Sequence, residues 1–179
     1  MSTTVEDVKA ALAAVVDPNT NKDYVSTRSV RNVQVDGGNV ALDIELGYPA
    51  RSQFALVRNA VIDAVRKLPG VQNVSVNVTS KIISHTVQRG LKVMPNVKNI
   101  IAVASGKGGV GKSTTAVNLA LALAAEGASV GVLDADIYGP SQPTMLGING
   151  RPQSLDGKTM EPLENHGVQV SSIGFLIDP

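Results

Sequence analysis

The first 80 residues carry apolar residues at two different spacings, one helical and one strand-like. A helical spacing begins after Thr3 and Glu6, which are separated as in a capping box, and we expect Asp17-Pro18-Asn19 to end this helix. Its apolar positions are Val5, Val8, Leu12 and Val15. Strict alternation from Val40 to Leu46 predicts a half-buried strand, and the turn signal Asp36-Gly37-Gly38 predicts a hairpin with a preceding strand at residues 30–35.

A second helix and a third strand follow. Ser52 can cap the helix, and Pro69-Gly70 ends it. Its predicted inner face carries Leu56, Ala60, Val61, Ala64, Val65 and Leu68. Valine then alternates at positions 74, 76 and 78, which predicts a strand. The pattern therefore predicts an α+β amino-terminal domain of order α-β-β-α-β over residues 1–80.

Residues 81–98 read as a linker between two domains. They contain Lys81, Arg89, Lys92 and Lys98, together with Gly90 and Pro95, and no acidic residue. A basic segment could touch nucleic acid or an acidic partner, but scattered charges with glycine and proline are more typical of a solvated tether. We expect a second domain at residues 99–179.

The second domain begins with longer apolar runs than the first. Residues 100–104 predict a buried strand, and residues 114–125 predict a helix that is apolar nearly all round and hence buried. Gly127 is placed to end this helix, and residues 128–133 predict another strand. Together these segments predict a βαβ unit over residues 99–136 with parallel strands and a right-handed crossover, and residues 168–176 predict a third strand. This is part of an α/β fold with a parallel sheet.

The segment between the first strand and the helix fits the phosphate-binding pattern G-x-x-x-x-G-K-[ST]. It comprises Gly106, Lys107, Gly108, Gly109, Val110, Gly111, Lys112, Ser113 and Thr114. The glycines let the backbone N–H groups point inward, and the helix start adds the positive end of its dipole. Lys112 would reach the β- and γ-phosphates of ATP, and the Ser113 hydroxyl would coordinate Mg²⁺.

Two carboxylates follow the next predicted strand. Asp134 and Asp136 lie at its carboxyl end, where open α/β sheets place their ligands, so we expect them to face the Mg²⁺ end of the loop. Residues 136–152 contain repeated glycine and proline and predict a loop or a short irregular helix.

Lys107, a second lysine in the loop, indicates a particular group of phosphate-loop proteins. The motif K-G-G-x-G-K-[ST] resembles the deviant Walker A motif of the MinD, ParA and nitrogenase iron-protein group, whose members are ATP-dependent dimers. The resemblance implies that Lys107 reaches the nucleotide of the partner subunit, that Asp134 holds a water on Mg²⁺, and that Asp136 orients the attacking water. It implies catalytic roles for Lys107, Lys112 and Asp136.

The segment D-A-D-I-Y-G-P-S at residues 134–141 resembles the Mrp/ApbC branch of this group, the iron-sulfur cluster carrier ATPases. That resemblance implies a homodimer that hydrolyses ATP and passes clusters from a scaffold to recipient apoproteins, with residues 136–152 as its switch region.

Residues 3–80, with D-P-N and Y-P-A-R, resemble the small iron-sulfur assembly domain. Many stand-alone members have a cysteine where Ala50 and Arg51 follow Pro49, so we interpret this domain as an interaction module.

Composition limits the remaining functions. A net charge of +1 and 3% aromatic residues give no case for nucleic-acid binding, and the absence of an 18-residue apolar span predicts a cytoplasmic protein without membrane contact. The chain has no cysteine, so it holds no thiolate ligand for a cluster. Because carriers of this branch use a C-x-x-C pair, we expect the chain to be the amino-terminal portion of a longer protein. His85 and His166 are isolated, and we assign no metal to them.

Two other functions stay open. A MinD- or ParA-like spatial-organisation ATPase would bind membrane or DNA in place of a cluster. A non-enzymatic, nucleotide-gated scaffold would hydrolyse ATP only incidentally.

Overall fold

The computed structural model describes residues 3–84 and 94–177, which fall into two compact units, Met1–Arg89 and Gly90–Pro179. The mixed α/β fold class is confirmed. The predicted boundaries at residues 80 and 98 stay predictions. Residues 85–93 of the predicted linker, which include His85, Arg89, Gly90 and Lys92, lie outside the described residues.

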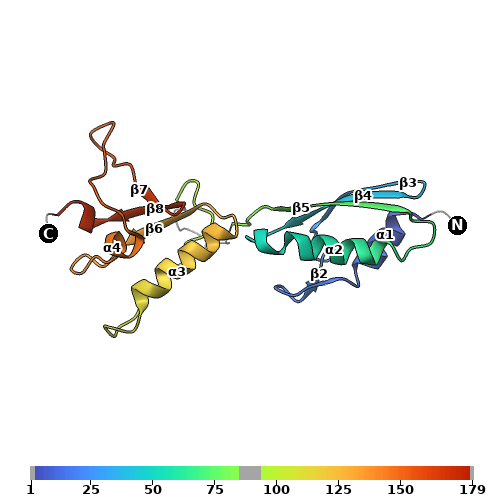
Figure 1. Ribbon diagram of the computed structural model, residues 1–179, viewed down its shortest axis with the longest axis horizontal. Coiled ribbons are helices and arrows are strands. Elements are labelled where there is room, and N and C mark those ends of the chain that lie inside the picture. The colour runs from blue at the N-terminus through green and yellow to red at the C-terminus, as the bar shows by residue number, and fades with distance from the viewer. Residues whose placement is uncertain (1–2, 85–93, 178–179) are drawn as a thin grey trace. The chain divides into compact units, whose positions relative to one another are not determined.

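The first unit is a three-stranded sheet with two helices on one face (Figure 1). Its elements are α1 (Val5–Leu12), β3 (Val30–Asp36), β4 (Asn39–Leu46), α2 (Phe54–Val65) and β5 (Asn73–Ser80). The central strand β4 pairs antiparallel with β3 and parallel with β5. The predicted order α-β-β-α-β is therefore present, with one addition that the pattern did not predict, a small hairpin of β1 (Val16–Asp17) and β2 (Lys22–Asp23).

The start of α1 differs by one residue from the sequence prediction. Thr4, not Thr3, is the N-cap, and the reciprocal partner in the capping box is Asp7, not Glu6. The Thr3 hydroxyl instead donates to the Pro69 carbonyl at 2.7 Å, which ties the residue before the N-cap to the turn that follows α2. Since both positions offer a threonine followed three residues later by an acid, the spacing alone does not distinguish them.

The buried face of α2 was predicted only in part. Val57, Val61 and Val65 are buried at i, i+4 spacing, whereas Leu56 is 71% exposed and Ala60 is also exposed. Because successive helical residues are about 100° apart, burying the Val57 stripe turns Leu56 and Ala60 away from the core, while Ala64 and Leu68 stay partly buried against it. The helix begins at Phe54 after a 3₁₀ turn, Arg51–Gln53 (η1), and Gln53 occupies its N-cap position without a capping side chain.

The second unit is a sheet of order β6-β8-β7 with α3 packed on it (Figure 1). Its elements are α3 (Lys112–Ala125), β6 (Val130–Asp134), α4 (Gln142–Leu146), β7 (Leu163–Asn165), β8 (Val168–Ser172) and the 3₁₀ turn η2 (Ile173–Phe175). Strands β6 and β8 are parallel, as expected for this class, and β7 forms an antiparallel hairpin with β8 that the sequence pattern did not predict.

Three predictions for this unit were wrong. Residues 100–104 form no strand, and Ile100 and Ile101 are 73% and 59% exposed. A strand needs the backbone of a neighbour, and among the described residues none pairs with this run, so the βαβ unit of residues 99–136 is not formed; β6 takes β8 as its parallel partner. Helix α3 buries only Val117 and Ala120, and the third strand ends at Ser172.

Candidate functional site

The glycine-rich loop that precedes α3 leaves open space beside its backbone. A Cβ atom built on Gly106, Gly108, Gly109 or Gly111 would meet nothing within 4 Å. Gly109 and Gly111 also have φ values of +71° and +86°, which side chains other than glycine rarely adopt. The protein therefore does not fill the loop, and a bound group can approach the backbone closely.

The first turn of α3 supplies the polar groups next to this loop. Gly111 is the N-cap, and the first helical bond runs from the Thr115 N–H to the Gly111 carbonyl at 2.9 Å. The N–H groups of Lys112, Ser113 and Thr114 thus precede the helical ladder, as at other helix starts that hold anions. Ser113 is half-buried in this turn, while Val110 in the loop is 52% exposed.

The structure brings together two of the predicted catalytic residues. Lys112 Nζ lies 3.5 Å from Asp136 Oδ2, joining the first turn of α3 to the loop after β6. Both side chains are partly exposed, at 34% and 45%. The other oxygen of Asp136 accepts the Gly139 N–H at 3.2 Å, which holds this carboxylate at the edge of the loop.

Lys107, the third predicted catalytic residue, stands apart from this pair. It is exposed, and its backbone N–H donates to Ser105 Oγ at 3.2 Å. In the described part of the chain its ammonium group takes part in no salt bridge. Its role across a dimer interface stays a prediction.

Asp134 occupies the end of β6 and is 6% exposed. Its Oδ2 accepts the N–H groups of Ser141 and Gln142 at 3.0 and 3.1 Å and the Ser172 hydroxyl at 3.1 Å. Its Oδ1 accepts the Asp136 N–H at 3.2 Å. Asp134 therefore holds the loop of residues 135–142 in place. Sequence reasoning missed Ser172, although it ends a strand that parallel pairing brings beside Asp134.

The side chains fit a Mg²⁺-nucleotide in the chemistry of their donors. Mg²⁺ bound with a nucleotide takes one or two protein oxygens and completes its shell with phosphates and water. The Ser113 hydroxyl and Asp134 Oδ1 are oxygens of this kind.

Among residues 3–84 and 94–177 no three His, Cys, Asp or Glu side chains group as metal ligands, and His166 lies exposed in the β7–β8 turn. No helix in the same ranges is long and apolar enough to span a membrane.

The first unit contains a buried polar cluster around Asp17, which is 3% exposed. Its carboxylate accepts the Tyr48 hydroxyl at 2.7 Å, the Thr20 hydroxyl at 3.1 Å and the Asn19 N–H at 2.9 Å. Burial, opposed by a hydrogen bond from Asn19 and reinforced by Asp17, raises the pKa of Tyr48 to about 12. Ala50, which follows Pro49, is buried and brings a methyl group and no thiol to its position.

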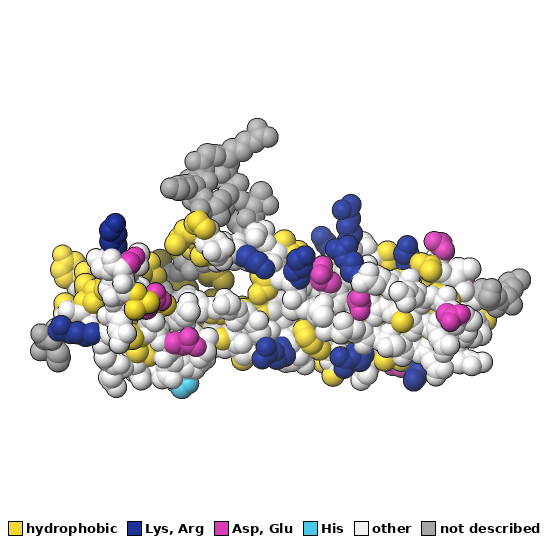
Figure 2. Space-filling model, turned by 90° about the horizontal axis from the view of Figure 1, so that it is seen from above, with side chains coloured by type: hydrophobic (Ala, Val, Ile, Leu, Met, Phe, Trp, Pro, Cys, Tyr) yellow, Lys and Arg dark blue, Asp and Glu magenta, His cyan; other side chains and the backbone are white. Residues whose placement is uncertain are grey.

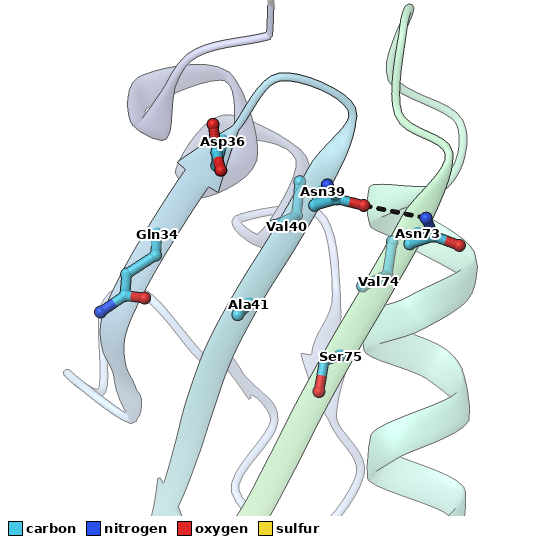
Figure 3. A pocket seen from close by; sticks show the side chains of 8 residues that line it. All are labelled: Gln34, Asp36, Asn39, Val40, Ala41, Asn73, Val74 and Ser75. Atoms are coloured by element: carbon cyan, nitrogen blue, oxygen red, sulfur yellow. Dashed lines mark hydrogen bonds between the residues drawn. The ribbon is translucent and has the colours of Figure 1, made fainter.

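The uncovered face of the first sheet has a shallow hollow, shown in Figure 3. Gln34, Asp36, Asn39, Val40, Ala41, Asn73, Val74 and Ser75 line it. A hydrogen bond of 2.8 Å from the Asn73 amide to Asn39 closes one side. Asp36 is its one charged lining residue, and the lining offers no second ionisable side chain for acid–base chemistry.

Comparison with known proteins finds a different family match for each of the two units. Residues 96–179 match the family described as NUBPL iron-transfer P-loop NTPase, and residues 5–78 match the iron-sulfur cluster assembly protein family. An iron-sulfur cluster carrier protein from Synechocystis sp. is 45% identical over 98% of this chain and 51% of its own length. One from Pseudomonas fragi is 57% identical over 64% of this chain and 41% of its own length.

A plant protein also matches. Fe-S cluster assembly factor HCF101, chloroplastic, from Arabidopsis thaliana is 40% identical over 97% of this chain and 34% of its own length. The chain thus spans about half, or less, of the length of these curated relatives. The resemblance to Mrp/ApbC-type carriers is confirmed: the chain joins a region similar to the iron-sulfur cluster assembly protein family to a region similar to the NUBPL iron-transfer P-loop NTPases.

Proposed function

We propose that this chain provides the ATP-binding part of a cytoplasmic carrier that binds iron-sulfur clusters and transfers them to apoproteins. The carrier acts as a homodimer, receives clusters from a scaffold and hydrolyses ATP. The full-length protein, by which we mean a carrier of the relatives' length that contains this chain, supplies the cluster ligands, because the chain has no cysteine. Its sections are residues 1–80, a linker at 81–98, and the first half of the ATPase domain at 99–179.

The observation that carries the ATP-binding proposal is the open glycine loop in front of the Lys112–Asp136 pair. A phosphate group in this loop would face backbone N–H groups, the start of α3 and the Lys112 ammonium, all of which favour negative charge. Mg²⁺, when bound, neutralises charge on the phosphates. Ser113 would hold the ion directly, and Asp134 would hold one of its waters.

Asp136 has a position suited to a role in turnover. In the structure its carboxylate pairs with Lys112, and an arriving γ-phosphate would compete for the same ammonium group. Release from Lys112 would leave Asp136, still held through the Gly139 N–H, able to orient a water for attack on the γ-phosphate. Asp136→Ala should slow turnover about a hundredfold and leave nucleotide affinity nearly unchanged. A normal turnover rate would remove Asp136 from the mechanism.

The test of the whole proposal is ATP-dependent cluster transfer by the full-length protein, reconstituted under anaerobic conditions. Wild type should hold a cluster, release phosphate from Mg-ATP and pass the cluster to an apoprotein, and Lys112→Ala should lose phosphate release. Lys158→Ala, which changes an exposed lysine of another loop, is the matched control. The 179-residue chain alone should hold no cluster and release little phosphate. Stable, stoichiometric cluster on that chain would overturn the assignment of the ligands.

The dimer proposal has its own test. If Lys107 acts on the nucleotide of the partner subunit, Lys107→Ala mixed with a Lys112→Ala subunit should regain part of the phosphate release that each variant lacks alone. In a mixed dimer one site then has both lysines. Failure of every mixing ratio would favour action of Lys107 within its own subunit.

A further inference from the structure

The ends of β6 and β8 meet in a buried polar contact that the sequence did not predict. Asp134 and Ser172 face each other in the parallel register, and each is 6% exposed. Ser172 Oγ donates to Asp134 Oδ2 at 3.1 Å and accepts the Gly174 N–H at 3.1 Å. Because the η2 turn supplies this donor to the hydroxyl oxygen, the single Ser172 proton is directed at the carboxylate.

The two oxygens of Asp134 have unequal surroundings. Oδ2 accepts three hydrogen bonds, from the Ser141 and Gln142 N–H groups and from Ser172, whereas Oδ1 accepts one, from Asp136. A carboxylate offers about four lone-pair sites in all. Oδ2 is therefore fully engaged inside the protein, and Oδ1 is the oxygen that retains accepting capacity.

The turn that supplies Ser172 is itself packed against the loop that Asp134 holds. A Cβ on Gly174 would lie 3.1 Å from Pro143 Cγ and 3.3 Å from two atoms of Pro140. The η2 turn and the loop of residues 135–142 are thus in close contact, and the Ser172 hydroxyl links the Gly174 N–H of the turn to the Asp134 carboxylate. One hydrogen bond to Asp134 and one from Gly174 therefore fix the position of the Ser172 hydroxyl.

We propose that Ser172 is a positioning residue for Mg²⁺, acting through Asp134. By holding Oδ2 it fixes the rotation of the carboxylate and keeps Oδ1 as the oxygen offered to a Mg²⁺-bound water. The inference rests on the proposed function, since it takes the loop of residues 106–114 as the nucleotide site. Removing a residue that hydrogen-bonds to a metal-binding side chain commonly weakens metal affinity about 10- to 100-fold.

The chain offers a matched control in the neighbouring residue. Ser171 precedes Ser172 on β8 and is exposed, because successive side chains of a strand point to opposite faces. Ser171→Ala and Ser172→Ala therefore remove the same hydroxyl from adjacent positions, and only the second changes Asp134. The Ser141 and Gln142 N–H groups still bind Oδ2 in both variants, so the loop keeps its main anchors.

The experiment is a Mg²⁺ titration of the full-length protein with a fluorescent, non-hydrolysable ATP analogue, paired with a nucleotide titration in EDTA. Ser172→Ala should raise the Mg²⁺ concentration at half-maximal effect about tenfold and leave the affinity in EDTA unchanged. Ser171→Ala should match wild type, and Ser172→Thr should restore most of the Mg²⁺ affinity because it keeps a hydroxyl. Thermal unfolding of each variant establishes that it is folded.

Two results would overturn the inference. In the first, Ser172→Ala and Ser171→Ala share the same Mg²⁺ midpoint. In the second, Ser172→Ala weakens nucleotide binding equally with and without Mg²⁺, which is the behaviour of a purely structural residue. A Lys112→Ala arm separates these from failure of the proposed function: if that variant binds the analogue normally, the nucleotide site itself is wrong and the inference falls with it.

Discussion

The two units of this chain differ in how far they cover their own apolar surface. The first closes a core of thirteen buried residues, whereas the second buries seven. Of the large hydrophobic residues that are exposed in the described ranges, three lie in the first unit and fourteen in the second. Figure 2 shows the same contrast, with hydrophobic side chains gathered over the second unit and charged ones more frequent over the first.

The buried polar groups of the first unit are also better supplied with hydrogen-bond partners than those of the second. In the first unit Asp17 is surrounded by donors from Asn19, Thr20 and Tyr48. In the second, Ser141 Oγ and Gln142 Oε1 are buried without a hydrogen-bond partner among the described residues. Exposed apolar area is typical of a surface that contacts something else, and buried oxygens without a partner are rare in a fully packed unit. The unit with the candidate chemistry is thus the one that depends on further contacts, which we expect the full-length protein to supply.

The largest effect is expected when a buried aliphatic side chain of the first unit is replaced by alanine, compared with the same replacement at an exposed position of the second unit. Ile44 in β4 is 0% exposed, and Leu133 in β6 is 76% exposed. Ile44→Ala should lower the free energy of unfolding of the first unit by about 2–5 kcal/mol, because it removes buried methyl groups and leaves a cavity. Leu133→Ala in the isolated chain should change stability by about 0.5 kcal/mol or less. Urea unfolding followed by circular dichroism measures both, and equal effects would contradict the contrast.

A smaller effect is expected where the second unit is closely packed. Gly174→Ala places a methyl group 3.1 Å from Pro143 Cγ, so the η2 turn or the proline loop must shift. We expect a loss of about 1–3 kcal/mol, the usual cost of overpacking. Gly131→Ala is the control, because its nearest neighbour, the Gln169 carbonyl oxygen, is 3.9 Å away. Equal melting temperatures for the two variants would show that the turn and the loop are loosely packed.

The smallest effect concerns the polar cluster of the first unit and depends on pH. Burial and then Asp17 raise the pKa of Tyr48 to about 12, from 10.0, while Asn19 opposes the shift. A raised folded-state pKa gives stability that is complete below pH 10 and lost as the pH rises to about 12. Tyr48→Phe should cost about 1 kcal/mol at neutral pH through the lost hydrogen bond to Asp17, and this difference should shrink above pH 10. A difference that stays constant from pH 8 to 11 would contradict the assignment.

Local pattern was sufficient for most of the fold, and the assignment of residues 106–114 as a phosphate loop stays a prediction. The alternation of β4 and the stop signals at Pro69-Gly70 and Gly127 are properties of adjacent residues, and the structure follows them. The errors in the first unit are local, namely the one-residue shift of the α1 N-cap and the exposed Leu56 of α2. The larger errors, in the second unit, depend on neighbours distant in sequence. Residues 100–104 have the composition of a strand without a strand partner, and Ser172 contacts Asp134 only because parallel pairing of β6 and β8 brings the two residues together. No spacing rule contains that information.

The most direct test of the central claim is an equilibrium titration of the full-length protein with a Mg²⁺-bound, non-hydrolysable ATP analogue. Wild type and Lys158→Ala should bind with the same affinity. Lys112→Ala should bind at least about a hundredfold more weakly, since it loses charge-assisted hydrogen bonds worth about 1.5–3 kcal/mol each. Undiminished affinity in Lys112→Ala, with the variant folded, would contradict the assignment of residues 106–114 as the nucleotide site.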